Sequence, residues 1–132
     1  MMFDESVYTK LVPSTPATHV LREKKHLVVY IAALWSVQCR TFTSELVDAY
    51  RQKSDNCPTE VAFISLDRTL DDYRRHCEQM PWLLVPYDAS FRYRLLDSCT
   101  VDTLPSIFVF DEMGRMVSRN DFAGYARLFL AG

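Results

Sequence analysis

Cys39 lies in a short segment, WSVQCR at residues 35–40, whose residue types suit thiol–disulfide chemistry. In a W-C-x-x-C-R arrangement the first cysteine lies at a helix N-terminus, where unpaired N–H groups and the helix dipole stabilise its thiolate. The pKa of such a thiol falls from about 8.5 to roughly 3.5–7.5, and the second cysteine resolves the mixed disulfide. Here Ser36 stands at the first position. Its hydroxyl is too weak an acid for that dipole to ionise, so the segment has the frame of a redox site without its attacking sulfur.

Two predicted elements hold this segment in place. Residues 27–34 are an apolar run with several β-branched side chains, bounded by charge before and by Ser36 after, which predicts a buried strand. Apolar residues then recur at three- and four-residue spacing, which predicts an amphipathic helix over residues 37–53. Ser36 stands where a helix N-cap belongs, and Cys39 follows one turn later.

The rest of the chain predicts an α/β domain. The expected elements are a strand at 61–66, a helix at 69–79, a short helix at 90–97, a strand at 106–110, a hairpin arm at 115–118 and a helix at 122–130. This order predicts a central mixed β-sheet flanked by helices on both faces. We expect a single domain over residues 1–132, in which residues 1–26 are a weakly patterned N-terminal extension.

Composition excludes several classes of partner. The hydrophobic fraction of 48% is enough for a packed core, and 15 basic against 17 acidic residues give a net charge of −2. This charge argues against nucleic acid or an anionic membrane as the main partner. The longest apolar run is far shorter than the roughly 20 residues of a membrane span. The first residues lack the apolar core of a signal peptide, so we expect a cytoplasmic protein, with uncleaved import into mitochondria left open.

The four cysteines are scattered and form no close pair. A chain that can build its own core needs no disulfide framework, so we expect reduced thiols packed as small hydrophobic side chains. Only His76 and Cys77 approach the spacing of zinc ligands, and we predict neither a metal nor a cofactor. His26 and His76 are interpreted as surface or helix-end residues without a role.

Three separated landmarks together resemble the thioredoxin superfamily, and within it the tryparedoxin and nucleoredoxin branch. They are WSVQCR at 35–40 after a strand, the loop MPWLLVPY at 80–87, and VDTLPS at 101–106 before the hairpin. That branch has W-C-P-P-C-R, a K-M-P-W-L-A-V-P-F-like loop and an I-P-T-like segment. The likeness covers about residues 27–119 in order and spacing, and the M-P-W-L-x-V-P loop is its specific signal. It implies a thioredoxin fold.

The resemblance also implies roles for individual residues. Ser36 falls at the nucleophile position and Cys39 at the position of the resolving cysteine, with Trp35 as the flanking aromatic residue. The loop around Trp82 would border the active-site face. Two departures from the branch are serine in place of the first cysteine and Val-Gln in place of Pro-Pro at residues 37–38.

Pro105 falls at the position of the family's cis-proline. If the bond before it is cis, the backbone turns so that Leu104 presents its N–H and C=O groups. An extended segment of a partner protein would then pair with those groups as an added strand.

Each of these residues also has a purely structural interpretation. Cys39 is either a functional thiol or a buried, inert cysteine, and we favour the second because reactivity needs exposure. Ser36 is either a polar contact for a substrate or simply the N-cap, and the N-cap is favoured. Trp82 fits a docking surface and an ordinary packed loop equally well. If both Trp35 and Trp82 are exposed, they form an apolar patch of the kind that marks binding sites.

Two functions follow. The leading hypothesis is a redox-inactive protein that binds a protein partner, or a larger assembly, through Trp35, Trp82, Leu104 and Pro105. The alternative is a thiol–disulfide oxidoreductase of altered, monothiol type that uses Cys39. Tryparedoxins pass electrons from the dithiol trypanothione through paired cysteines, so the resemblance implies a trypanothione-type dithiol as the partner in that case. A weaker third reading is a chaperone-like protein that binds peptides without redox chemistry.

Overall fold

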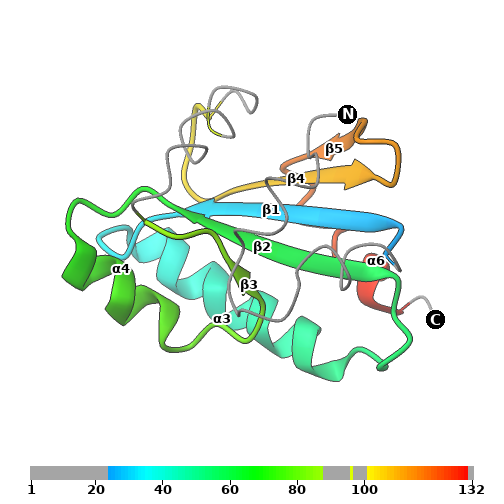
Figure 1. Cartoon of the computed structure of the whole chain (residues 1–132), viewed down its shortest axis with the longest axis horizontal. Coiled ribbons are helices and arrows are strands. Elements are labelled where there is room, and N and C mark those ends of the chain that lie inside the picture. Colours follow the sequence, from blue (N-terminus) through cyan, green and yellow to red (C-terminus); the bar gives the residue numbers. More distant parts are fainter. Residues whose placement is uncertain (1–23, 88–95, 97–100, 131–132) are drawn as a thin grey trace.

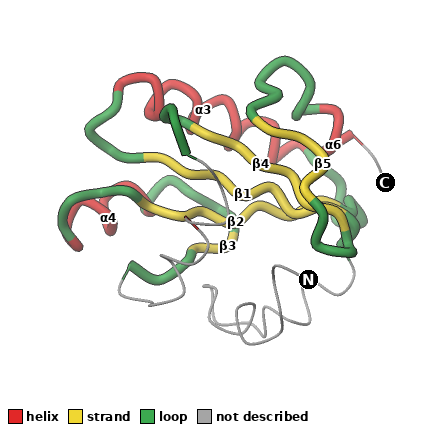
Figure 2. The backbone as a smooth tube through the Cα atoms, turned by 90° about the horizontal axis from the view of Figure 1, so that it is seen from above, coloured by secondary structure: helices red, strands yellow, loops and turns green. Residues whose placement is uncertain are grey.

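A five-stranded mixed sheet forms the centre of the part of the chain that the computed structural model describes, residues 24–87, 96 and 101–130 (Figure 1). The strands are β1 His26–Ala32, β2 Thr59–Ser65, β3 Leu83–Leu84, β4 Ser106–Asp111 and β5 Met116–Arg119. Their order across the sheet is β3-β2-β1-β4-β5, which Figure 2 shows from above. β1 runs parallel to β2 and antiparallel to β4, so the predicted parallel pair and antiparallel hairpin are confirmed.

The central strand β1 is buried on both faces. Over residues 27–32 its odd-numbered side chains enter one apolar cluster and its even-numbered side chains enter another. This alternation is the period-two geometry of a strand between two layers. β1 therefore holds the sheet between its two cores, and the chain leaves it directly into the WSVQCR segment.

Three helices cover the face of the sheet that carries Tyr30: α3 Val37–Gln52, α4 Leu70–Cys77 and α6 Arg127–Leu130. The Tyr30 hydroxyl fixes α3 against β1, since it lies 2.6 Å from the Thr43 hydroxyl and donates to the Cys39 carbonyl over 3.2 Å. Leu96 and Val101 pack against the opposite face, and Leu104 contacts both apolar clusters.

Most of the predicted strands and helices agree with the observed ones to within two residues at each end. The predicted helix 69–79 is α4, which ends earlier, at Cys77. The predicted loop 80–87 contains the short strand β3, whose residues pair with Ala62 and Phe63. Of the predicted helix 90–97 the structure describes only Leu96, which is helical, and most of the predicted extension 1–26 lies outside the described residues.

The last predicted helix, 122–130, is wrong over its first half. Residues 122–126 form turns, and the α-helix begins at Arg127. The Asp121 side chain accepts a hydrogen bond from the Gly124 amide at 2.9 Å, and the Asp121 carbonyl accepts from the Tyr125 amide at 3.0 Å. These are the bonds of an N-cap, but the amides of Arg127, Leu128 and Phe129 then bond carbonyls three residues back rather than four, so the segment forms turns before the short α-helix.

Among the described residues, none of the helices is both long enough and apolar enough to span a bilayer.

Candidate functional site

Ser36 caps the N-terminus of α3, as expected. Its backbone is extended (φ −90°, ψ 122°), and its hydroxyl oxygen accepts a hydrogen bond from the Cys39 amide at 3.3 Å. The Ser36 carbonyl accepts the first helical bond, from the Arg40 amide at 3.1 Å. The side chain is 7% exposed, and its hydroxyl also donates to Gln38 Oε1 at 3.3 Å. The hydroxyl therefore satisfies one of the free N–H groups that would stabilise a thiolate at the same position.

Cys39 lies in the core beneath β1. Its exposed fraction is 0%, and it belongs to the apolar cluster that contains Tyr30, Phe42 and Leu46. Cys39, Cys57 and Cys77 are all free thiols. Attack on an external disulfide requires the sulfur to reach it, so the buried position agrees with the structural interpretation of this cysteine.

A cavity of about 570 Å³ opens beside Ser36. The start of α3 and the loop after β2 form one wall, and the segment before β4 forms the other. It is lined by Trp35, Ser36, Gln38, Leu66, Val101, Asp102, Thr103 and Leu104. The structure thus brings Trp35, Ser36 and Leu104 together although about 70 residues separate them in the sequence. The Leu104–Pro105 peptide bond is cis, and both residues are partly exposed.

Trp35 is the exposed aromatic residue of this face. It is 52% exposed, and Val37, two residues on, is 62% exposed. The Arg68 guanidinium lies over the Trp35 ring, 5.2 Å from its centroid. A cation at this distance stabilises one placement of the ring while leaving much of its surface open.

Trp82 is buried, with an exposed fraction of 1%, and so does not form an apolar patch with Trp35. Its ring meets those of Tyr30 and Tyr50 at centroid distances of 6.2 and 5.6 Å. Because β3 pairs with β2, successive side chains point to opposite faces, which sends Trp82 under the sheet and Leu83 to the other core. Of the two interpretations of this loop, the structure supports ordinary packing.

His76 lies in the last turn of α4, so it is a helix-end residue as expected, but it is buried and not on the surface. Its exposed fraction is 0%, and its Nδ1 lies 3.0 Å from Asp67 Oδ2. Sequence reasoning missed this pair. The available signal was the spacing of His76 three residues after Tyr73, which places it on the inward side of α4.

Asp67 collects hydrogen bonds from three elements. It accepts from the Leu34 amide at 2.6 Å, from the Ser65 hydroxyl at 2.6 Å and from His76. Burial alone raises the pKa of this carboxyl, but the hydrogen bonds from His76, Ser65 and Leu34 outweigh burial and hold the pKa below its usual range. Asp67 is therefore ionised at neutral pH. Its carboxylate lies behind the turn that carries Trp35, because it accepts the hydrogen bond from Leu34.

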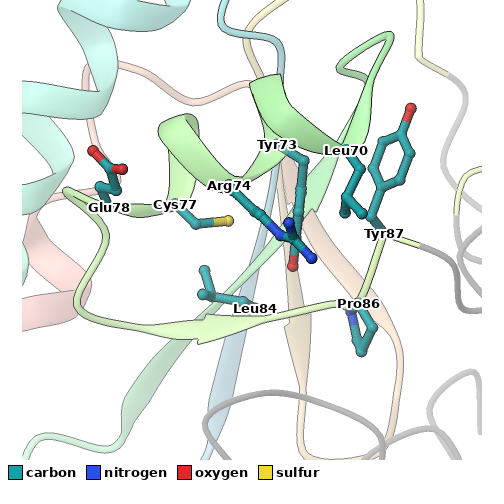
Figure 3. A pocket seen from close by; sticks show the side chains of 8 residues that line it. All are labelled: Leu70, Tyr73, Arg74, Cys77, Glu78, Leu84, Pro86 and Tyr87. Atoms are coloured by element: carbon teal, nitrogen blue, oxygen red, sulfur yellow. The ribbon is translucent and has the colours of Figure 1, made fainter.

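A second cavity, of about 540 Å³, lies between α4 and the chain around β3 (Figure 3). Most of its lining is apolar, and Cys77, on α4, is the one thiol among its lining residues. Burial, reinforced by the charge of Asp67, raises the pKa of Cys77 to about 11. That thiol is protonated at neutral pH and is a weak nucleophile. Among the described residues, no three His, Cys, Asp or Glu side chains lie close enough to hold a metal ion.

The sheet is mixed, its strand β1 leads into the capped helix α3, and a cis-proline segment lies beside that cap. Together with the family match, this arrangement confirms the predicted thioredoxin fold. The chain belongs to the thioredoxin-like family, whose sequence model matches residues 24–116. Over 99 residues it is 36% identical to bovine nucleoredoxin (Bos taurus), a match that covers 74% of this chain and 23% of that protein. The chain thus spans about a quarter of the length of that relative.

Solved structures agree with the family assignment. Tryparedoxin from Trypanosoma brucei superposes with a TM-score of 0.75 at 26% identity, over 86% of this chain and 81% of that one. A tryparedoxin II complexed with glutathionylspermidine gives a TM-score of 0.67 at 26% identity, over 74% of this chain and 69% of that one. The likeness to the nucleoredoxin and tryparedoxin branch is therefore supported by sequence and by fold.

Cys39 is expected to resist thiol reagents in the native protein. Labelling of a core thiol requires a local opening that costs a few kcal/mol, so its rate should be at least roughly 100-fold slower than in denaturant. Mass spectrometry after timed exposure to a maleimide would measure this rate, with Cys57, 1% exposed, as the internal control. Labelling of native Cys39 at the rate seen in denaturant would contradict its burial.

Asp67→Asn is expected to lower the free energy of unfolding at pH 7 by about 1.5–3 kcal/mol, because hydrogen bonds to a charged group are lost. The native pKa of Asp67 is lowered, so its contribution is present above the unfolded pKa of about 3.9 and is lost as pH falls through the native pKa. The difference between wild type and variant should therefore shrink in acid. Urea unfolding at pH 7 and at successively lower pH measures it.

Asp72→Asn is the matched control for that experiment. Asp72 is a partly exposed carboxylate on α4 that pairs with exposed Arg75 at 2.6 Å. Such surface pairs contribute about 0–1 kcal/mol. An equal loss of unfolding free energy in the two variants would show that the buried hydrogen bonds of Asp67 stabilise the fold no more than a surface ion pair does.

Proposed function

We propose that this chain binds proteins through the face formed by Trp35, Ser36 and Leu104, and that it performs no dithiol exchange. The observation that supports this most is the pair of positions on α3: a serine hydroxyl caps the helix where exchange needs a thiolate, and the thiol one turn later is 0% exposed. An alcohol at the first position cannot form the mixed disulfide on which the reaction depends.

The surface around these residues supports a binding role. Trp35 and Val37 expose apolar area next to a cavity of about 570 Å³, which is within the usual size of ligand pockets. Exposed apolar patches of this kind mark interaction sites on soluble domains. Thioredoxin-like proteins commonly bind protein substrates, and an extended segment laid along residues 101–104 would meet Trp35 across the cavity.

The partner in this proposal is another protein or a larger assembly. The net charge of −2 gives no reason to invoke nucleic acid or an anionic membrane. The location we propose is the cytoplasm, with mitochondria as the other intracellular site to test.

A second candidate is a monothiol oxidoreductase. The favouring observation is that Cys39 stays one turn inside the helix, beside Arg40, in a chain similar to tryparedoxin from Trypanosoma brucei. In this reaction the Cys39 thiolate attacks a disulfide, forms a mixed disulfide with one half and releases the other half as a thiolate. A trypanothione-type dithiol would then reduce the mixed disulfide; the thiol seen with the related tryparedoxin II is glutathionylspermidine. The reaction needs an opening that exposes Cys39.

Ser36→Cys is expected to confer dithiol exchange on this protein. The new thiol would lie at the N-terminus of α3, with the Cys39 sulfur one turn away as the resolving thiol. Reduction of insulin by dithiothreitol, followed by turbidity, measures the gain. The wild type should match the uncatalysed rate, whereas the variant should exceed it clearly.

Ser36→Cys combined with Cys39→Ser is the control, because it keeps one thiol and removes the resolving one. A folded Ser36→Cys protein without activity would mean that the site lacks more than one sulfur. Turnover by the wild type that disappears in Cys39→Ser would favour the monothiol reaction over the binding role.

Trp35→Ala is expected to weaken binding of extended peptides about 30-fold, the cost of losing a central aromatic contact of about 2 kcal/mol. Peptides selected on the immobilised wild type from a random display library would serve as probes, with affinities measured by calorimetry. Val117→Ala is the matched control, because Val117 is 53% exposed but lies on the edge strand β5. Equal peptide affinity of the two variants would show that the peptides bind elsewhere than at Trp35.

A further inference from the structure

A buried polar network lies directly behind the proposed binding face. Asp67 is 3% exposed and follows β2. Its carboxylate joins the amide of Leu34, after β1, to the Ser65 hydroxyl at the end of β2 and to His76 on α4. The two oxygens divide these partners, since Oδ1 accepts from Leu34 and Oδ2 from Ser65 and lies beside His76. One charged group thus connects three elements of the fold.

The peptide groups of Leu34 are held from both sides. Its amide donates to Asp67 at 2.6 Å, and its carbonyl accepts from the Arg40 guanidinium at 2.7 Å. Trp35 is the next residue, and Arg68, the residue after Asp67, lies over its ring. The residues that fix Asp67 and Leu34 therefore also determine where Trp35 stands on the binding face.

His76 is the contribution of α4 to this network. Because Asp67 is ionised, the shared proton lies on Nδ1, which donates to the carboxylate. The ring packs edge-on against Phe63 at 4.8 Å, and Nε2 has no hydrogen-bond partner among the described residues. A buried nitrogen without a partner destabilises the fold, so packing alone does not account for a histidine here.

We propose that His76 is a positioning residue, whose hydrogen bond to Asp67 fixes the turn at Leu34 and Trp35 and so keeps the binding face assembled. The importance of this role for function rests on the binding activity proposed above. His76 itself touches no partner in this proposal and acts through the carboxylate.

Other ionisable groups face the same carboxylate or its backbone. Cys77 on α4 feels the charge of Asp67, and the Tyr87 hydroxyl, after β3, donates to the Asp67 carbonyl at 2.7 Å. Arg68 follows in the chain, and Arg40 on α3 lies on the far side of the Leu34 peptide. Because the pKa of Cys77 is raised, its thiol stays neutral while Asp67 titrates in acid.

The test compares His76→Asn with His76→Gln. The amide of asparagine reaches the place of Nδ1 and can donate to Asp67, whereas the longer glutamine places its amide near Nε2 and cannot. Both variants remove the imidazole, so loss of aromatic packing is common to them. Amide hydrogen exchange measured by NMR at Leu34 reads the turn directly, and Val28 in the middle of β1 is the reference for global stability.

We expect the Leu34 amide of His76→Gln to exchange roughly tenfold or more faster than that of His76→Asn, with equal rates at Val28. Equal Leu34 rates in the two variants would overturn the proposal. If His76→Gln does not fold, nitrogen shifts of the wild-type imidazole decide the matter: a protonated Nδ1 at pH 7 supports the proposal and an unprotonated Nδ1 overturns it. These measurements need no binding partner, so the positioning role can fail while the binding function stands, or the reverse.

Discussion

The burial of β1 on both faces is the constraint on which the rest of the structure depends. A strand enclosed by two apolar layers has one register that keeps its side chains in both of them, because a shift by one residue would exchange the layers. That register determines where β1 ends, and therefore where the Leu34 turn and the start of α3 lie. Trp35 and Ser36 have little freedom once the sheet has formed, since only the short turn of residues 33–36 separates β1 from α3.

The helix at this site needs a cap, and serine satisfies that need without supplying a thiol. Serine is among the strongest N-cap residues, so the scaffold keeps its local stability when the first position carries an alcohol. Folding therefore requires a capping side chain at this position, whereas disulfide exchange requires a thiolate. Ser36 supplies the cap, and Trp35 and residues 101–104 of the cavity wall are partly or fully exposed.

The sequence was sufficient for the elements whose pattern is local and strong. The run at 27–34, the helix after Ser36 and the hairpin at the end of the sheet all have a clear period or a turn residue. It was insufficient where a tertiary contact decides the outcome. Trp82 is turned under the sheet by the pairing of two residues in β3, which leaves no periodic signal. The spacing of His76 from Tyr73 indicates the inward side of α4, but it does not reveal the carboxylate of Asp67 as the partner. The turns at 122–126 arise where the following amides bond carbonyls three residues back, which the apolar spacing of this segment does not predict.

The serine cap has a consequence for how the site responds to oxidising and reducing conditions. A relative with two sulfurs at this place alternates between a bridged and an open form as conditions become oxidising or reducing. An alcohol has no second form of that kind, and the neighbouring sulfur is enclosed by the core. The binding that we propose for the face beside Trp35 would therefore be the same under oxidising and reducing conditions.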